Sequence, residues 1–166
     1  MQPFSPNATT GPVSDGHSID VLTAHLQTGF YYARYILFRP FVFKALHSPE
    51  LVSPLDAEHC ALAINSMCLW PSLRSSIKTK KRLMPHLYSW TQNYRGMLLI
   101  FHAIRRHDFL RWICNEKVDF ERVQETVILM MDWIRDAKQV DGTGEWGLKM
   151  VEPLFEQHLR WIPDRK

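Results

Sequence analysis

Apolar residues recur at three- and four-residue steps along most of the chain, which is the spacing of one helical face. Ser18 or Asp20 can cap the first such stretch. Its apolar positions are Leu22, Leu26, Ala33 and Leu37. Pro40 removes one backbone donor and disfavours helical geometry at Arg39. We therefore expect the first helix to end or kink at Pro40, before FVFKAL, with a second stop at HSPE.

The segment SPLDAEHCALAINSMCLWP has the clearest helix start in the chain. Ser53 is placed to cap the helix, and Pro54 stands at its first position, where a missing N–H costs nothing. Asp56 follows three residues after the cap, where its side chain can bond back to the residue that caps the helix. We predict a helix that runs to about Trp70 and is stopped by Pro71.

Further helical stretches follow this segment. A third helix is expected from near Pro85, with a break near His107 and a continuation through FLRWICNE. Asp119 can cap a fourth helix, whose apolar stripe is Phe120, Val123, Val127, Met131 and Ile134. A final helix from about Glu145 to Trp161 contains Pro153, which should kink or divide it.

No segment alternates apolar and polar residues in the manner of a half-buried strand, and the chain has only seven glycines. The sequence therefore predicts an all-α fold, an irregular array of five to seven helices. We expect a flexible N-terminal arm over residues 1–17, a helical domain over 18–162 and a C-terminal tail over 163–166.

Length and composition fit one globular domain, because 166 residues with 46% apolar content can bury a sizeable core. A net charge of +3 falls well short of the dense basic footprint of a nucleic-acid binder. Cys60, Cys68 and Cys114 are scattered within helical patterns, which favours buried, reduced thiols in an intracellular protein. No secretory signal and no apolar run of about 18 residues are present, so we expect a soluble protein without membrane contact.

Motifs for catalysis and metal binding are missing from the sequence. The eight histidines include no H-E-x-x-H pair, and His102 and His107 stand five residues apart. There is no G-x-S-x-G elbow, and DGTGEWG lacks the lysine of a phosphate-binding loop and looks like an interhelical turn. We therefore predict no enzyme activity, no catalytic residue, no metal and no cofactor.

A basic run lies between the second and third expected helices, with five basic side chains over residues 72–82 and no acid. Its members Lys78, Lys80, Lys81 and Arg82 could form a nuclear-import signal or contact phosphate. Runs of this length are more often solvated loops, and no aromatic residue is interleaved to stack on bases. We therefore predict no direct DNA binding by this chain.

Aromatic residues are the chain's most unusual feature. The stretch YYARYILFRPF is interrupted by Arg34 and Arg39, which argues against membrane insertion, and its aromatics point nearly all around a helix, which suits burial. Six tryptophans suit a core or an interface. A second hypothesis is that the chain is a small helical enzyme or ligand carrier. Its hydrophobic pocket would be lined by Tyr35, Trp90, Phe101 and Trp133.

The order of several segments resembles the C-terminal half of the regulatory domain of fungal binuclear zinc-cluster transcription factors, the fungal-specific middle homology region. These segments are HLQTGFYYARYILFRPFVFKALHSPE, DAEHCALAINSMCLWP, KKRLMPHLYSWTQN, ETVILMMDWIRDAKQVDGTGEW and VEPLFE. The resemblance extends over roughly residues 20–157. Arg39, Pro40 and Phe41 mark the most specific part of the resemblance.

The resemblance implies an all-helical, nuclear protein that regulates transcription. Its expected partners are the transcription machinery or the rest of its own regulatory domain, with a small-molecule effector as a further partner. The role of Arg39, Pro40 and Phe41 is expected to be structural. Pro40 would end the helix and Phe41 would re-enter the core, while Arg39 would bond the last free carbonyls or pair with a carboxylate.

The chain departs from the full family pattern in one decisive way. The six clustered cysteines that hold two zinc ions are absent, as are the linker and the heptads that follow them. We therefore expect a regulatory module without zinc and without DNA contact. The sequence leaves open whether the chain is a natural product, a truncated gene product or an excised fragment.

Overall fold

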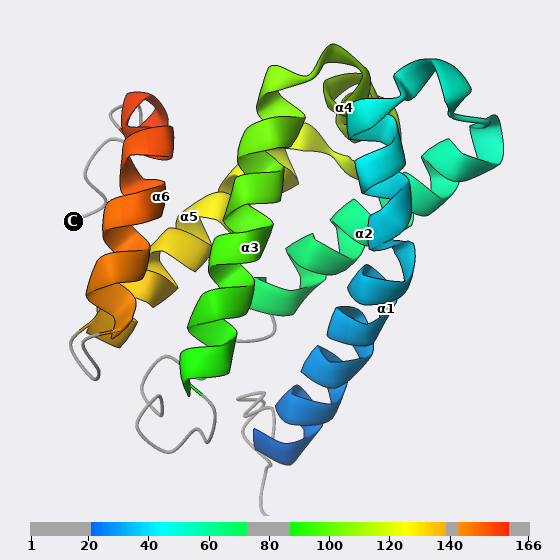
Figure 1. The fold of residues 1–166 in the computed structure, drawn as a ribbon. Coiled ribbons are helices and arrows are strands. Elements are labelled where there is room, and N and C mark those ends of the chain that lie inside the picture. Colours follow the sequence, from blue (N-terminus) through cyan, green and yellow to red (C-terminus); the bar gives the residue numbers. More distant parts are fainter. Residues whose placement is uncertain (1–20, 73–86, 139–142, 160–166) are drawn as a thin grey trace, which may run out of the picture.

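The computed structural model describes residues 21–72, 87–138 and 143–159, which are almost entirely helical and contain no strand. Six α-helices make up these ranges, which confirms the predicted all-α array of five to seven helices (Figure 1). They are α1 (Val21–His47), α2 (Pro54–Ser72), α3 (Leu87–Arg106), α4 (Asp108–Ile113), α5 (Phe120–Lys138) and α6 (Thr143–Leu159), with a 3-10 turn η1 (Pro49–Leu51) and a π-helical turn η3 (Cys114–Val118). The predicted arm over 1–17 and the tail over 163–166 lie outside the described residues.

The helices form an array in which α1 and α6 lie at opposite sides (Figure 1). Helix α1 packs along α2, α2 contacts α5, and α3 contacts both α5 and α6. The core lies where α2, α3 and α5 meet. Its largest fully buried side chains are Trp70, Tyr94, Phe101, Phe155, Ile64, Met67, Met97, Leu98, Ile104, Leu110 and Ile113.

The predicted start of α2 is confirmed down to its hydrogen bonds. The amide and the hydroxyl of Ser53 both donate to Asp56 Oδ2, at 2.9 and 2.8 Å, and the amide of Asp56 donates to Ser53 Oγ at 3.2 Å. This reciprocal arrangement satisfies amide groups that the first helical turn leaves without partners. Helix α2 continues through Pro71 to Ser72, slightly beyond the predicted end.

The prediction that α1 ends at Pro40 is wrong, because one helix runs from Val21 to His47 with Pro40 inside it. Pro40 is exposed, so the carbonyl of Ile36, which would have accepted its missing N–H, lies on the outer side of the helix. Beyond the proline, Val42 and Ala45 are buried in the core. Packing of these residues therefore stabilises the last turns of α1 despite the lost bond. The second predicted stop, at HSPE, is confirmed.

Proline is tolerated in the same way in α6, which runs undivided through Pro153 although the sequence allowed a division there. Pro153 is exposed, whereas Val151 and Phe155 on either side of it are buried. Tertiary packing of the buried face thus outweighs the local cost of the proline in both helices.

The break after α3 lies at His107, as predicted, and the continuation through FLRWICNE is only partly an α-helix. The stretch begins as the α-helix α4 and continues as the π-helical turn η3. Asp119, the predicted cap of α5, has a φ of 95° and accepts a bond at 3.0 Å from the amide of Glu121. The side chain of Asp119 therefore supports the start of α5 at the point where the chain reverses.

Candidate functional site

Six aromatic side chains from four helices form one connected group, which we call the aromatic cluster. Its members are Tyr32, Tyr35, Trp70, Trp90, Tyr94 and Trp133. Ring centroids lie 5.2 Å apart for Trp70 and Tyr94, 5.8 Å for Tyr94 and Trp133 and 6.2 Å for Trp90 and Trp133. These separations are those of directly packed aromatic rings. The cluster thus ties α1, α2, α3 and α5 together.

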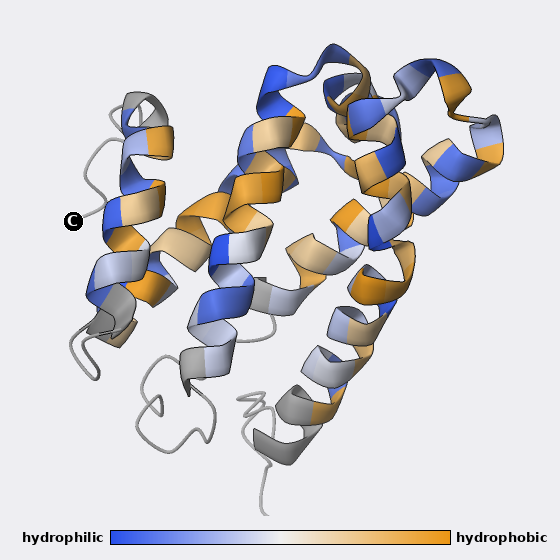
Figure 2. Cartoon of the chain, viewed as in Figure 1, coloured by the Kyte–Doolittle hydropathy of each residue, from blue (hydrophilic) through white to orange (hydrophobic). Residues whose placement is uncertain are grey.

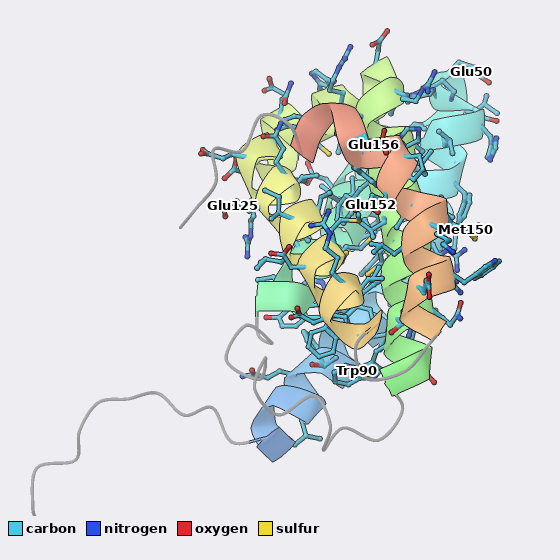
Figure 3. All side chains as sticks on the ribbon, turned by 90° about the vertical axis from the view of Figure 1, so that its left-hand side faces the viewer. Glu50, Trp90, Glu125, Met150, Glu152 and Glu156 are labelled. Carbon is cyan, nitrogen blue, oxygen red and sulfur yellow. The ribbon has the colours of Figure 1, made fainter. Side chains whose placement is uncertain are left out.

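The structure brings three of the four predicted pocket residues into this cluster. Tyr35 joins it through Tyr32, and Trp90 and Trp133 are in direct contact. Figure 3 shows Trp90 at the lower end of the array. Phe101 is also buried but does not belong to the cluster. It follows Trp90 by eleven residues, so the two positions are about 16 Å apart along α3.

Sequence reasoning missed Tyr94 as a member of this group. Its four-residue spacing from Trp90 on one helix was the available signal, because side chains four apart share a helical face. Within the cluster, ring–ring contacts occupy the space between the helices. The arrangement is suited to fixing four helices in one geometry.

Two tyrosines of α1 bring polar hydroxyl groups into the cluster. The hydroxyl of Tyr32 donates to Asn93 Oδ1 at 3.2 Å, which links α1 to α3. Burial raises the pKa of Tyr35, and the nearby Arg39 only partly opposes this. Tyr35 is therefore held in its neutral form at physiological pH.

The three cysteines are free and buried, as predicted. Burial raises the pKa of Cys60 to about 12, of Cys68 to about 11 and of Cys114 to about 12. A thiol reacts as its thiolate, so these side chains are poor nucleophiles in the folded protein at neutral pH.

Two further properties concern only the residues that the structure describes. Among them, no group of three or more His, Cys, Asp or Glu side chains is placed to hold a metal ion. Within the same ranges, no helix is both long enough and apolar enough to cross a membrane. The basic run Lys78, Lys80, Lys81 and Arg82 lies outside the described residues.

The motif residues Arg39, Pro40 and Phe41 lie within α1 and do not end it. Arg39 was expected at a helix end, yet the last turn of α1 carries Lys44 and His47 instead. The Arg39 guanidinium is exposed and lies over the ring of Phe43, 4.9 Å from its centroid. Arg39 therefore packs on an aromatic face in place of the predicted contact with free carbonyls or a carboxylate.

Phe41 contacts the core from its margin. It is half-buried, and its ring lies 4.6 Å from that of His59 on α2. Phe38 stacks on the same imidazole, with ring centroids 5.1 Å apart. Two phenylalanines of α1 thus pack against one histidine of α2, and the role of these contacts is structural.

Helix α1 also presents an apolar surface that no other described element covers, which we call the outer face of α1. Its exposed members are Leu26, Gly29, Phe30, Ala33, Ile36, Leu37, Pro40 and Phe43. Leu26, Phe30 and Leu37 expose 65%, 60% and 68% of their surface. Hydrophobic residues recur along α1 at the right-hand edge of the array (Figure 2). The guanidinium of Arg39 borders this face, where it lies over the ring of Phe43.

The sequence-based interpretation of α1 as a buried helix is therefore wrong for one of its sides. Leu26, Ala33 and Leu37, which the periodicity singled out as its apolar positions, are exposed, whereas the opposite side of the helix enters the core. Thr28, Tyr35 and Val42 mark that buried side. Because α1 is apolar nearly all around, helical spacing alone could not show which side α2 covers.

Comparisons with known proteins add no relative to this picture. No family model, no curated protein and no solved structure matches the chain. Any function must therefore be argued from the residues and from the fold.

Proposed function

We propose that the chain is a noncatalytic regulatory and interaction domain of a fungal-specific transcription factor of the binuclear zinc-cluster type. The observation that carries the interaction role is the outer face of α1. The transcriptional role rests on the resemblance of segments over roughly residues 20–157 to the regulatory domain of that family. On this proposal the protein acts in the nucleus, through protein partners or an effector and without touching DNA itself.

The outer face of α1 is a large apolar patch for a soluble monomer. Five of its large side chains, Leu26, Phe30, Ile36, Leu37 and Phe43, expose between 38% and 68% of their surface. Together they leave on the order of 500 Å² of contiguous apolar surface in water, which is near the upper end for a soluble monomer. Such patches mark protein contact sites, because burying them removes apolar surface from water.

The buried half of the molecule supports a noncatalytic role. The aromatic cluster consists of rings in mutual contact, and burial keeps Tyr35 and the three thiols in their neutral forms. The ring contacts join α1 to α2, α3 and α5 behind the outer face. On this proposal, these contacts keep the outer face in one shape, which lowers the entropy cost of binding a partner.

A reporter assay tests the proposal. The chain is fused between a heterologous DNA-binding domain and an activation domain in a fungal cell, and reporter output is compared with that of the fusion without the chain. We expect the chain to change reporter output, and the substitutions Phe30→Lys and Leu37→Lys to abolish the change.

The matched control is Leu99→Lys, because Leu99 is 45% exposed but lies on α3. This variant should behave as the unsubstituted chain does. Unchanged output with the unsubstituted chain would contradict the proposal, as would an equal loss in the control.

A further inference from the structure

We infer that the outer face of α1 binds the same face of a second copy of this chain, with the two α1 helices antiparallel and a two-fold axis beside Ala33. The inference rests on the proposed interaction role of that face and names its partner. An isologous contact requires one patch that complements itself when it is turned by 180°. The sequence of α1 meets this requirement residue by residue.

In the antiparallel pair, residues equally far before and after Ala33 face each other across the axis. Gly29 of one copy then faces Leu37 of the other, and Phe30 faces Ile36. A large side chain therefore meets the space that a glycine leaves, and Ala33 meets its own counterpart with little bulk between the helices. The small residues Gly29 and Ala33 allow the two helices to approach closely at these positions.

Gly29 leaves room for a second helix to approach closely. A Cβ built on Gly29 meets nothing within 4 Å, so nothing in the described fold requires a glycine there. Glycine within a helix is nevertheless less favourable than alanine. A second helix crossing at this position accounts for the missing side chain. Gly96 on α3 is equally open, outside the apolar face, and offers a matched control.

The area fits a second copy of the chain. Each copy offers on the order of 500 Å² of apolar surface, so the pair would bury about 1,000 Å² in total. That area lies at the lower limit for a specific interface. We therefore expect a reversible dimer with a Kd in the micromolar range, in place of an obligate one.

Sedimentation equilibrium of the complete 166-residue chain, from about 1 to 100 μM, measures this association. We expect a monomer–dimer equilibrium that Leu37→Lys and Gly29→Leu each weaken by about tenfold or more. Leu99→Lys and Gly96→Leu are the matched controls and should leave it unchanged. Far-UV circular dichroism establishes that each variant keeps its helices, and all four positions lie on exposed helix surfaces.

A cross-linking measurement tests the position of the axis. The native thiols are buried, so any intermolecular disulfide is expected to form through an added surface cysteine. Ala33→Cys should form an intermolecular disulfide rapidly under mild oxidation, because the two copies of position 33 meet at the axis. Leu99→Cys should do so much more slowly.

A chain that remains monomeric at 100 μM would overturn the inference, and so would a dimer that Leu37→Lys and Leu99→Lys affect equally. Equal cross-linking rates at positions 33 and 99 would overturn the antiparallel arrangement.

The dimer and the transcriptional role can be contradicted independently of each other. If the chain is monomeric but Leu37→Lys still abolishes its effect on the reporter, only the dimer is contradicted. If the chain forms the dimer but has no effect on the reporter, only the transcriptional role is contradicted.

Discussion

Gly147 on α6 leaves room for the side chain of Arg95 on α3. A Cβ built on Gly147 would lie 2.6 Å from Arg95 Cδ, closer than side-chain carbons pack. Arg95 is only 9% exposed, and its guanidinium lies over the ring of Trp146, 4.6 Å from the centroid. An alanine at position 147 would therefore force the Arg95 side chain to shift.

We predict that Gly147→Ala destabilises the protein although alanine is the better helix former. The new methyl group overlaps the Arg95 side chain, and we expect an overpacking cost of about 2 kcal/mol, which exceeds the gain in helix propensity of about 1 kcal/mol. Urea unfolding monitored by circular dichroism measures the free energy of unfolding.

Gly96→Ala is the control for this prediction, because a Cβ at Gly96 meets nothing within 4 Å. It should raise the free energy of unfolding by up to about 1 kcal/mol. Equal effects of the two substitutions would contradict the role assigned to Gly147.

The ion pair between Lys44 and Asp56 predicts a stability change in acid. Lys44 Nζ lies 2.8 Å from Asp56 Oδ2 and joins the last turn of α1 to the first turn of α2. This hydrogen bond from Lys44, with those from Ser53, lowers the pKa of Asp56 from 3.8 to about 2. A carboxyl whose pKa is lower in the folded state stabilises the fold above the unfolded pKa, so this stabilisation is lost as the pH falls from about 4 to about 2.

Thermal unfolding between pH 2 and pH 5 tests this prediction. The unsubstituted chain should lose more stability over that range than Asp56→Asn, which has no carboxyl to protonate. Asp108→Asn removes an exposed acid from the start of α4 and is the control for a general charge effect. A pH dependence of Asp56→Asn as steep as that of the unsubstituted chain would show that Asp56 contributes nothing.

The buried thiols predict a large difference in reactivity between the folded and unfolded protein. At pH 8 the native chain should react with an aromatic disulfide reagent very slowly, because burial raises the pKa of Cys60 and Cys114 to about 12 and removes both from solvent. In guanidinium chloride all three cysteines should react within minutes. Rapid reaction of even one thiol in the native protein would contradict its assigned burial.

The sequence predicted the elements whose ends depend on local chemistry. Ser53 and Asp56 cap α2 through bonds between residues three apart, and Asp119 bonds the second residue beyond it, so neither feature needs the rest of the fold. The fold class followed from helical spacing along the whole chain. The candidate pocket was predicted less well, because Trp90 and Trp133 meet only through the packing of α3 on α5, and Phe101 lies turns away along α3.

The sequence by itself thus determined the all-helical class, the caps of α2 and α5 and the burial of the cysteines. Only the tertiary structure decided that α1 continues through Pro40 and which of its apolar sides remains open, because packing of Val42 and Ala45 outweighs the local cost of the proline. The need for glycine at Gly147 also became visible only when α3 brought Arg95 against α6. Contacts between residues far apart in the chain have no local pattern that reveals them.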